Sequence, residues 1–298
     1  MKFSTLLKGT GVTTLISYFA YKKISDQLFK TIFSRKDKQD IVEQKYLDWI
    51  NESTVNQVNI TSFDGLKLNA YDIHNHENAN YLIMLHGLTS SKASMYPRAF
   101  EFDKLGYNIL LIDQRATGDS QGEYHTYGLK EAQDLNQWID YLNNTYKDIK
   151  ICLFGVSMGA ATIMISAAYD LPDNVKCIVE DCGFSSLREE LDYFIRSKYK
   201  ITYTSSVLKM LDKKMISRFG FSIDDVAPKK CLEENEIPIL FVHGKDDDFV
   251  PFDHALRNYN HNKGIKKFYP VPGTGHGQAN KDPEYYTNIA NFINTYMI

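Results

Sequence analysis

A serine that stands between two glycines, where one apolar run ends and another begins, limits the folds open to this chain. Residues 155–159 read Gly-Val-Ser-Met-Gly and fit the pattern G-x-S-x-G. The apolar residues 151–154 before them are typical of a buried strand, and residues 160–165 after them are typical of the start of a buried helix. A strand that turns at once into a helix holds the serine in a strained conformation and needs small flanking residues. The Ser157 hydroxyl is therefore predicted to project from the edge of a sheet, where a substrate can reach it.

Strand-like and helix-like patterns alternate along the chain after a predicted hairpin at 55–73. We expect strands at 81–85, 108–112, 150–154, 176–180, 237–242 and 266–270, and helices at 41–52, 95–105, 128–145, 158–170, 253–261 and 283–297. Such alternation is typical of a mostly parallel sheet with helices on both faces. It breaks between Asp181 and Glu236, where two helical patterns rich in aromatic residues begin at Leu187 and Ser205. The predicted fold class is therefore α/β, with eight strands and a helical cap at about residues 183–235 after strand six.

A serine hydroxyl is a poor nucleophile, so it needs a base, and the base needs an acid that orients it. The order expected after this kind of turn is serine, then acid, then histidine. An acidic run, residues 246–248, follows one expected strand, and His276 stands between two glycines after the next. The carboxyl ends of parallel strands share one edge of a sheet, which is where ligands bind. Ser157, one of the three aspartates and His276 are therefore predicted to meet there.

These segments resemble the α/β-hydrolase superfamily over roughly residues 55–298. The stretch anchored by Gly244, Val250 and Pro251 is similar to the family pattern G-x-x-D-x-x-V-P, which implies Asp247 as the acid and Asp248 as the second candidate. More narrowly, the chain resembles bacterial membrane-linked serine hydrolases near the prolyl-oligopeptidase-like and acyl-CoA-thioesterase-like branch. The likeness implies hydrolysis of esters, thioesters or short peptides without a metal or an organic cofactor.

One further segment is similar to the family but departs from it. Asp113–Gly122 resembles the pattern D-x-R-G-x-G-x-S, except that Ala116 stands where the family has a glycine. We therefore expect the geometry of this loop to be less typical, without an effect on the three site residues.

The negative charge that develops on a carbonyl oxygen during attack needs N–H donors that are already in place. The backbone N–H of Met158, the residue after the serine, is predicted to be one donor. The second is expected from the loop after the strand at 81–85, where the dipeptide His86-Gly87 resembles the oxyanion loop of the family. The resemblance implies the N–H of Leu88 as this donor, and His86 is interpreted as a brace for the loop.

The N-terminal segment, residues 1–38, differs in charge from the domain expected at 39–298. Its net charge is +6 against −9 for the remainder, and Gly9–Tyr21 is an uncharged, mainly apolar stretch of 13 residues. Spanning a bilayer takes about 20 residues, a length approached only by extending back to Phe3 and including Lys8. A membrane anchor, a cleaved signal peptide and a helix packed on the domain are all compatible with this pattern. The basic residues that follow the stretch favour a membrane-associated protein with a cytoplasmic catalytic domain, with a secreted or extracellular domain as the alternative.

The residues predict a serine hydrolase of the carboxylesterase or lipase type that acts on esters with short or medium acyl chains. A peptidase or thioesterase of the same fold is the alternative, followed by a non-catalytic binding or scaffold protein. A peptidase would need an acidic anchor for a peptide N-terminus, and Glu189 and Glu190 are interpreted instead as a charged helix face. The net charge of −3 gives no reason to expect a nucleic-acid partner, and the four cysteines include no C-x-x-C pair that would indicate a zinc site.

Overall fold

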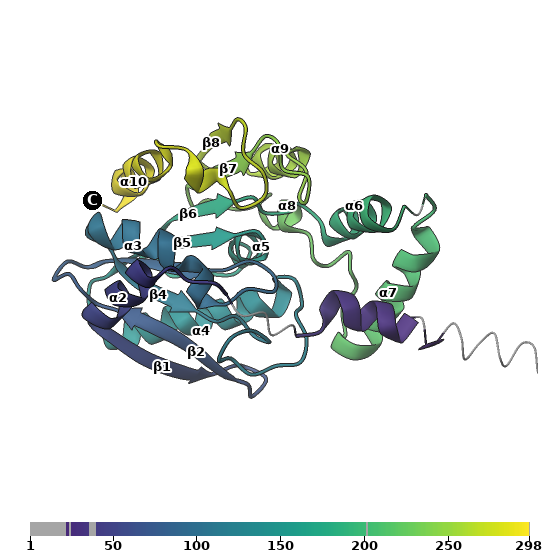
Figure 1. The fold of residues 1–298 in the computed structure, drawn as a ribbon, viewed down its shortest axis with the longest axis horizontal. Helices are drawn as coiled ribbons and strands as arrows, with labels where there is room; N and C mark the ends of the chain where they lie inside the picture. Colours follow the sequence, from purple (N-terminus) through teal and green to yellow (C-terminus); the bar gives the residue numbers. More distant parts are fainter. Residues whose placement is uncertain (1–21, 24, 36–39, 201, 298) are drawn as a thin grey trace, which may run out of the picture.

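An eight-stranded sheet forms the centre of the computed structural model, which describes residues 22–23, 25–35, 40–200 and 202–297 (Figure 1). Its strands are β1 (Val55–Thr61), β2 (Lys67–Ile73), β3 (Asn80–Leu85), β4 (Asn108–Ile112), β5 (Lys150–Val156), β6 (Val175–Asp181), β7 (Ile239–Gly244) and β8 (Lys266–Val271). The central strands are continuous apolar runs buried on both faces, as expected for a parallel sheet covered on both sides.

The strand order is β1-β2-β4-β3-β5-β6-β7-β8. The hairpin β1–β2 is antiparallel and β2 runs antiparallel to β4, whereas every neighbouring pair from β4 to β8 is parallel. The predicted fold class, a mostly parallel eight-stranded sheet, is confirmed. Because β3 to β8 all point the same way, the loops that follow them lie along one edge of the sheet.

Helices cover both faces of the sheet and bury a separate apolar cluster on each. One face carries α2 (Gln44–Glu52), α3 (Tyr96–Lys104) and α10 (Tyr285–Tyr296). The other carries α4 (Leu129–Thr145), α5 (Met158–Ser166) and α9 (Asp253–His261). Two short 3₁₀ helices, η1 (Lys92–Met95) and η2 (Ala279–Lys281), complete the connections between these elements and the strands.

The predicted cap lies between β6 and β7 and consists of α6 (Leu187–Tyr199), α7 (Ser205–Phe219) and α8 (Pro228–Cys231). Its buried apolar residues form a third cluster, which also includes Ala161 and Ile165 of α5 and Tyr127 of the loop before α4. The cap therefore packs on the helix that follows Ser157 and covers that end of the sheet.

The N-terminal helix, residues 25–33, packs in this third cluster and lies beside α7 in Figure 1, in purple. Phe29, Ile32 and Phe33 are buried there, and the hydroxyl of Tyr127 donates a hydrogen bond to the Ile32 carbonyl oxygen at 2.9 Å. The part of segment 1–38 that the structure describes therefore packs against the domain. Within the described residues no helix has the length and apolar character needed to cross a membrane, and the stretch Gly9–Tyr21 lies outside them.

Candidate active site

Ser157 occupies a strained turn between β5 and α5. Its φ of 57° and ψ of −114° lie outside the regions that residues other than glycine normally adopt. The turn requires small neighbours, because a Cβ atom at Gly159 would lie 2.3 Å from the carbonyl oxygen of Leu85 at the end of β3. The strain exposes the Ser157 hydroxyl at the carboxyl edge of the sheet, as the G-x-S-x-G pattern predicted.

Ser157, His276 and Asp247 form one continuous chain of hydrogen bonds. The distance from His276 Nε2 to Ser157 Oγ is 2.9 Å, and the distance from His276 Nδ1 to Asp247 Oδ2 is 2.8 Å. The three side chains come from the loops after β5, β7 and β8 and are separated by up to 119 positions in the chain. The geometry therefore gives the hydroxyl a base within proton-transfer reach and gives that base an oriented partner.

The structure distinguishes the three neighbouring aspartates that the sequence left open. Asp247 is buried, whereas Asp246 and Asp248 are exposed. Asp247 Oδ1 accepts hydrogen bonds from the backbone N–H groups of Phe249 and Val250, both at 2.9 Å. These bonds fix the carboxylate so that its other oxygen faces His276.

His243, at the end of β7, supports this carboxylate, although no sequence motif indicates that role. Its Nε2 lies 2.8 Å from the Val250 carbonyl oxygen and 3.3 Å from Asp247 Oδ2. Burial alone would raise the pKa of Asp247, but hydrogen bonds from His243 and His276 outweigh it and hold that pKa well below its usual range. Asp247 is therefore ionised at neutral pH.

Leu88 and Met158, the two predicted N–H donors, both line the cavity above Ser157. Neither N–H donates a hydrogen bond to another residue that the structure describes. The loop approaches closely, since a Cβ atom at Gly87 would lie 3.3 Å from Ser157 Cβ and 3.8 Å from its Oγ. Both N–H groups thus remain free to meet an oxygen at the reacting carbon.

His86 holds the Leu88 loop in place, as the sequence predicted. The Gln114 N–H donates to His86 Nε2 at 3.2 Å, so the ring proton is on Nδ1, which donates to the Gly87 carbonyl oxygen at 2.7 Å. Burial lowers the pKa of His86, so the ring stays neutral. The side-chain amide of Gln114 adds a further bond of 2.6 Å to the His86 carbonyl oxygen.

A cavity of about 440 Å³ is lined by Ser157 and His276. Its walls come from the loop after β3, from α3, from α6 of the cap and from the N-terminal helix. Most of the cap and N-terminal wall is apolar, with Ile32, Phe184, Leu191 and Phe194 among its residues. The volume falls in the range typical of small-molecule sites and suits a ligand with an apolar chain.

Two buried polar residues of this cavity, Arg98 and Glu190, were not assigned to it from the sequence. Arg98 of α3 is buried, and its Nη2 donates to the Gly277 carbonyl oxygen at 2.8 Å, which ties α3 to the loop that carries His276. Arg98 also pairs with the Asp181 carboxylate and donates to the Tyr285 hydroxyl oxygen, both at 3.4 Å. No sequence motif indicates this role, because all these partners lie far from Arg98 in the chain.

Glu190 is the second, and here the interpretation as a charged helix face is wrong. Glu189 fits that interpretation, since it pairs with Lys229 and Arg257 at 2.7 and 2.5 Å. Glu190 instead lines the cavity and is only 6% exposed. A sequence signal existed, because Glu190 falls within the apolar i, i+3, i+4, i+7 stripe of α6 formed by Leu187, Leu191 and Phe194.

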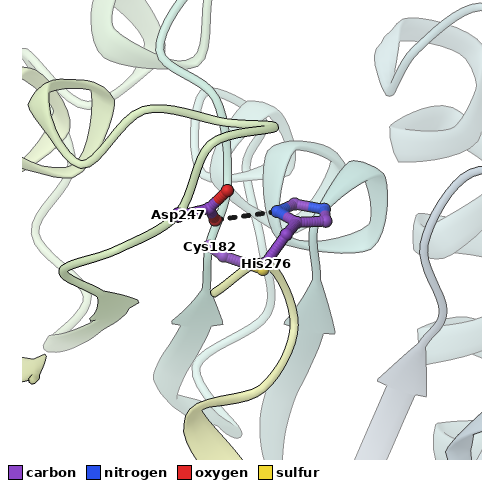
Figure 2. A group of neighbouring side chains, drawn as sticks. All are labelled: Cys182, Asp247 and His276. Carbon is purple, nitrogen blue, oxygen red and sulfur yellow. Dashed lines mark hydrogen bonds and ion pairs between the residues drawn. The ribbon is translucent and has the colours of Figure 1, made fainter. Parts of the chain in front are cut away.

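Cys182 lies beside the site, where its sulfur and the ligand atoms of Asp247 and His276 fall within 4.8 Å of one another (Figure 2). Three such donors could in principle hold a metal ion. Burial, however, raises the pKa of the Cys182 thiol well above its usual value, and the imidazole and carboxylate already bind each other. Cysteine binds metal ions as a thiolate, and here the thiol keeps its proton at neutral pH. This set of three side chains therefore does not fit a metal centre.

Comparison with known proteins agrees with this architecture. A family model described as alpha/beta hydrolase fold matches residues 80–204. The chain is similar to protein YqkD of Bacillus subtilis, with 31% identity over 221 residues that cover 74% of this chain and 72% of YqkD. A shorter match, 31% identity over 147 residues, relates 47% of this chain to 46% of thiohydrolase aneE of Aspergillus aculeatus.

Among solved structures, the esterase Pf2001 of Pyrococcus furiosus superposes with a TM-score of 0.70 and 24% identity, covering 88% of this chain and 99% of the esterase. At that identity the likeness concerns the fold. It extends over most of this chain and almost the whole of the esterase.

Proposed function

The chain belongs to the α/β hydrolase superfamily, and from that premise we propose that it is a serine hydrolase that cleaves carboxylic esters through an acyl-enzyme intermediate. One observation carries the proposal. The hydroxyl of Ser157, the imidazole of His276 and the carboxylate of Asp247 are linked by hydrogen bonds of 2.9 and 2.8 Å, and Ser157 and His276 line a cavity with a largely apolar wall on the cap side.

In the proposed reaction Ser157 Oγ attacks the ester carbon while His276 Nε2 takes its proton. The carbonyl oxygen becomes negatively charged and accepts hydrogen bonds from the N–H groups of Leu88 and Met158. When the intermediate collapses, the C–O bond to the alcohol breaks and His276 returns the proton to that oxygen. Water then attacks the acyl group by the same route. Asp247 fixes the ring so that Nε2 faces the serine, and its charge stabilises the imidazolium.

The shape of the cavity supports esters with short or medium acyl chains as substrates. A thioester is the second candidate, and the similarity to thiohydrolase aneE favours it over a peptide. Both reactions use the same attack and differ in the leaving group, a thiol in place of an alcohol.

A fluorophosphonate probe tests the nucleophile directly, because it phosphonylates an activated serine. We expect the wild-type protein to be labelled and Ser157→Ala to be unlabelled, with a loss of ester turnover on the order of 10⁶-fold. Labelling of the mutant at the wild-type rate would contradict the assignment. Absence of labelling in both would support a non-catalytic binding protein.

Substrate preference is tested with the wild-type enzyme on 4-nitrophenyl esters of graded chain length, on acyl thioesters of matched length and on aminoacyl 4-nitroanilides. We expect the highest kcat/KM for an ester of two to about eight carbons. Faster turnover of the thioesters would favour the second candidate, and faster turnover of the anilides would contradict both.

We further propose that the protein associates with the cytoplasmic face of a membrane through Gly9–Tyr21. The support is compositional, since an apolar stretch followed by Lys22 and Lys23 suits the boundary between lipid and headgroups. A membrane location would bring the cavity near lipid-derived esters.

A further inference from the structure

The Glu190 carboxyl is a polar group without a partner in the apolar wall of the active-site cavity. Glu190 lies on α6 among the buried residues Leu187, Leu191 and Ile195 and lines the cavity with only 6% of its surface exposed. Its Oε2 is sealed from solvent and has no hydrogen-bond partner among the residues that the structure describes. Buried carboxyl groups in folded proteins are nearly always hydrogen-bonded, so this one calls for an explanation.

His254 of α9 is the nearest polar side chain, but it does not satisfy the carboxyl. Its Nε2 lies 3.6 Å from Glu190 Oε2, beyond hydrogen-bonding distance. The other ring nitrogen, Nδ1, accepts a hydrogen bond from the Ser185 backbone N–H at 3.1 Å and lies 2.9 Å from the Ser185 hydroxyl. Because Nδ1 accepts, the ring proton is on Nε2, which faces Glu190 Oε2 without coming within hydrogen-bonding distance.

Protonation makes the carboxyl suited to a neutral ligand. Burial raises the pKa of Glu190 to about 8, and the nearby charge of Asp247 acts in the same direction. Burial and the charge of Arg257 lower the pKa of His254 to about 4, so neither member of the pair is charged at neutral pH. A protonated carboxyl both donates and accepts a hydrogen bond, as a hydroxyl group does.

The remaining charged groups of the cavity wall argue against a cationic ligand. Lys198 lines the same cavity and carries a positive charge, whereas the charge of Arg98 is balanced by its ion pair with Asp181 at 3.4 Å. Apolar side chains make up much of the remaining wall near Glu190, including Phe184 and Leu191. A ligand that is apolar along its chain and carries one neutral polar substituent fits these surroundings best.

We propose that Glu190 forms a polar subsite that binds a hydroxyl group on the chain of the substrate. The inference rests on the proposed ester hydrolysis and narrows its substrate class to hydroxylated esters. Because Oε2 is sealed and faces His254, the hydroxyl would bind the other carboxyl oxygen, Oε1, to which no described residue donates a hydrogen bond. Glu190 is then a specificity residue, and the bond-breaking step stays with Ser157 and His276.

The test compares wild type, Glu190→Gln and Glu190→Met. The first set of substrates consists of ethyl esters of straight-chain acids and of the same esters with one hydroxyl group on the acyl chain, at a carbon from C2 to C6. The second set consists of alkyl butyrates with and without a hydroxyl group on the alcohol chain. We expect wild type to hydrolyse at least one hydroxy ester about tenfold or more faster, in kcat/KM, than its parent. Glu190→Gln retains most of this preference because the amide also donates and accepts. Glu190→Met loses it, so that its kcat/KM values for the hydroxy ester and for the parent ester become similar.

A merely structural role for Glu190 predicts another result, in which Glu190→Met loses activity on parent and hydroxy esters to the same extent. That result, or a wild type with no preference for any hydroxy ester, would overturn the subsite. Preference for the corresponding amino esters over the hydroxy esters would overturn it in favour of a cationic ligand.

Binding to the Ser157→Ala protein separates this inference from the proposed function. The hydroxy ester should bind about tenfold more tightly than its parent there, and the added Glu190→Met substitution should abolish the difference. If wild type hydrolyses no ester yet this binding difference is present, the subsite stands and the proposed function fails. If esters are hydrolysed and the binding difference is absent, the subsite fails and the proposed function stands.

Discussion

At the scale of single residues, the protonated Glu190 carboxyl makes folding stability depend on pH. Its pKa is raised to about 8 in the folded protein, against an ordinary value near 4.5 in the unfolded chain. Between these two values the folded state keeps a proton that the unfolded state loses, so the contribution of Glu190 to stability is full below about pH 4.5 and is lost as the pH rises to 8.

Replacing Glu190 by glutamine removes this titration. We expect the free energy of unfolding of Glu190→Gln, relative to wild type, to increase by about 2–4 kcal/mol from pH 5 to pH 8, since one pKa unit corresponds to about 1.4 kcal/mol. Urea unfolding of both proteins at several pH values measures this difference in the free energy of unfolding. The contributions of His254, whose pKa is about 4 in the folded protein against an ordinary value of 6.5, and of Glu180, whose pKa is raised, are present in both proteins and cancel in the difference. A difference that is constant with pH would mean that Glu190 is ionised in the folded protein.

The sequence predicted the positions of Ser157, Asp247 and His276, because each lies in a short motif whose residue types can be recognised from neighbouring positions. Glu190 and Arg98 do not lie in such a motif. Their environment is created by packing between segments far apart in the chain, where Arg98 meets Gly277 and Glu190 faces α9. Sequence alone therefore indicates the reacting groups better than the groups that surround the substrate.

At the scale of elements, the first turn of α5 packs directly on the end of β3. A Cβ atom at Gly159 would lie 2.3 Å from the Leu85 carbonyl oxygen and 2.8 Å from that of His86, and both are backbone atoms. We expect Gly159→Ala to lower the free energy of unfolding by at least about 2 kcal/mol and to reduce ester turnover, because α5 must move and Ser157 moves with it. Urea unfolding and initial rates measure the two effects.

Gly275→Ala is the matched control, since it is also a glycine-to-alanine change on a site loop. Its Cβ would meet only the Asp246 carbonyl oxygen, at 3.8 Å, which is ordinary contact. We expect its stability to stay within about 0.5 kcal/mol of wild type. Equal stability of the two variants would contradict the close packing of α5 on β3.

Most elements could be predicted because their apolar periodicity is strong. β4 and α9 begin and end at the expected residues, and the other strands differ by only a few positions. Helix ends were less predictable. α6 continues to Tyr199 and is followed by Lys200 with a φ of 55°, a conformation that normally signals glycine. The expected helix at 158–170 ends at Ser166, since an apolar pattern does not mark where packing stops a helix.

At the scale of the whole molecule, the N-terminal helix is part of the active-site wall. Thr31 and Ile32 line the cavity, although Ser157 is more than a hundred positions further along the chain. The sequence predicted a boundary at residue 38 from charge alone, and charge carries no information on which distant surface a segment contacts. The position of the cap depends on the same long-range packing, in which the rings of Phe29 and of Phe219 in α7 lie 5.9 Å apart.

Two deletions therefore separate anchoring from catalysis. A protein that lacks residues 2–21 keeps the helix at 25–33 and should retain ester turnover within about twofold while leaving the membrane fraction of the expressing cells. A protein that lacks residues 2–38 also loses one wall of the cavity and the burial of Phe29, Ile32 and Phe33. Burial of each of these side chains stabilises the folded state by about 2 kcal/mol. We expect it to melt at a lower temperature and to lose about tenfold or more in kcat/KM.

Full-length Phe33→Ala is the control for the longer deletion, because it removes packing of the helix and leaves residues 1–21 in place. It should lower the free energy of unfolding by about 3–5 kcal/mol and stay in the membrane fraction. A 2–38 deletion as stable and active as the 2–21 deletion would show that the helix contributes nothing to the cavity. A 2–21 deletion that stays with the membrane would place the attachment on the folded domain, since the apolar stretch would then be absent.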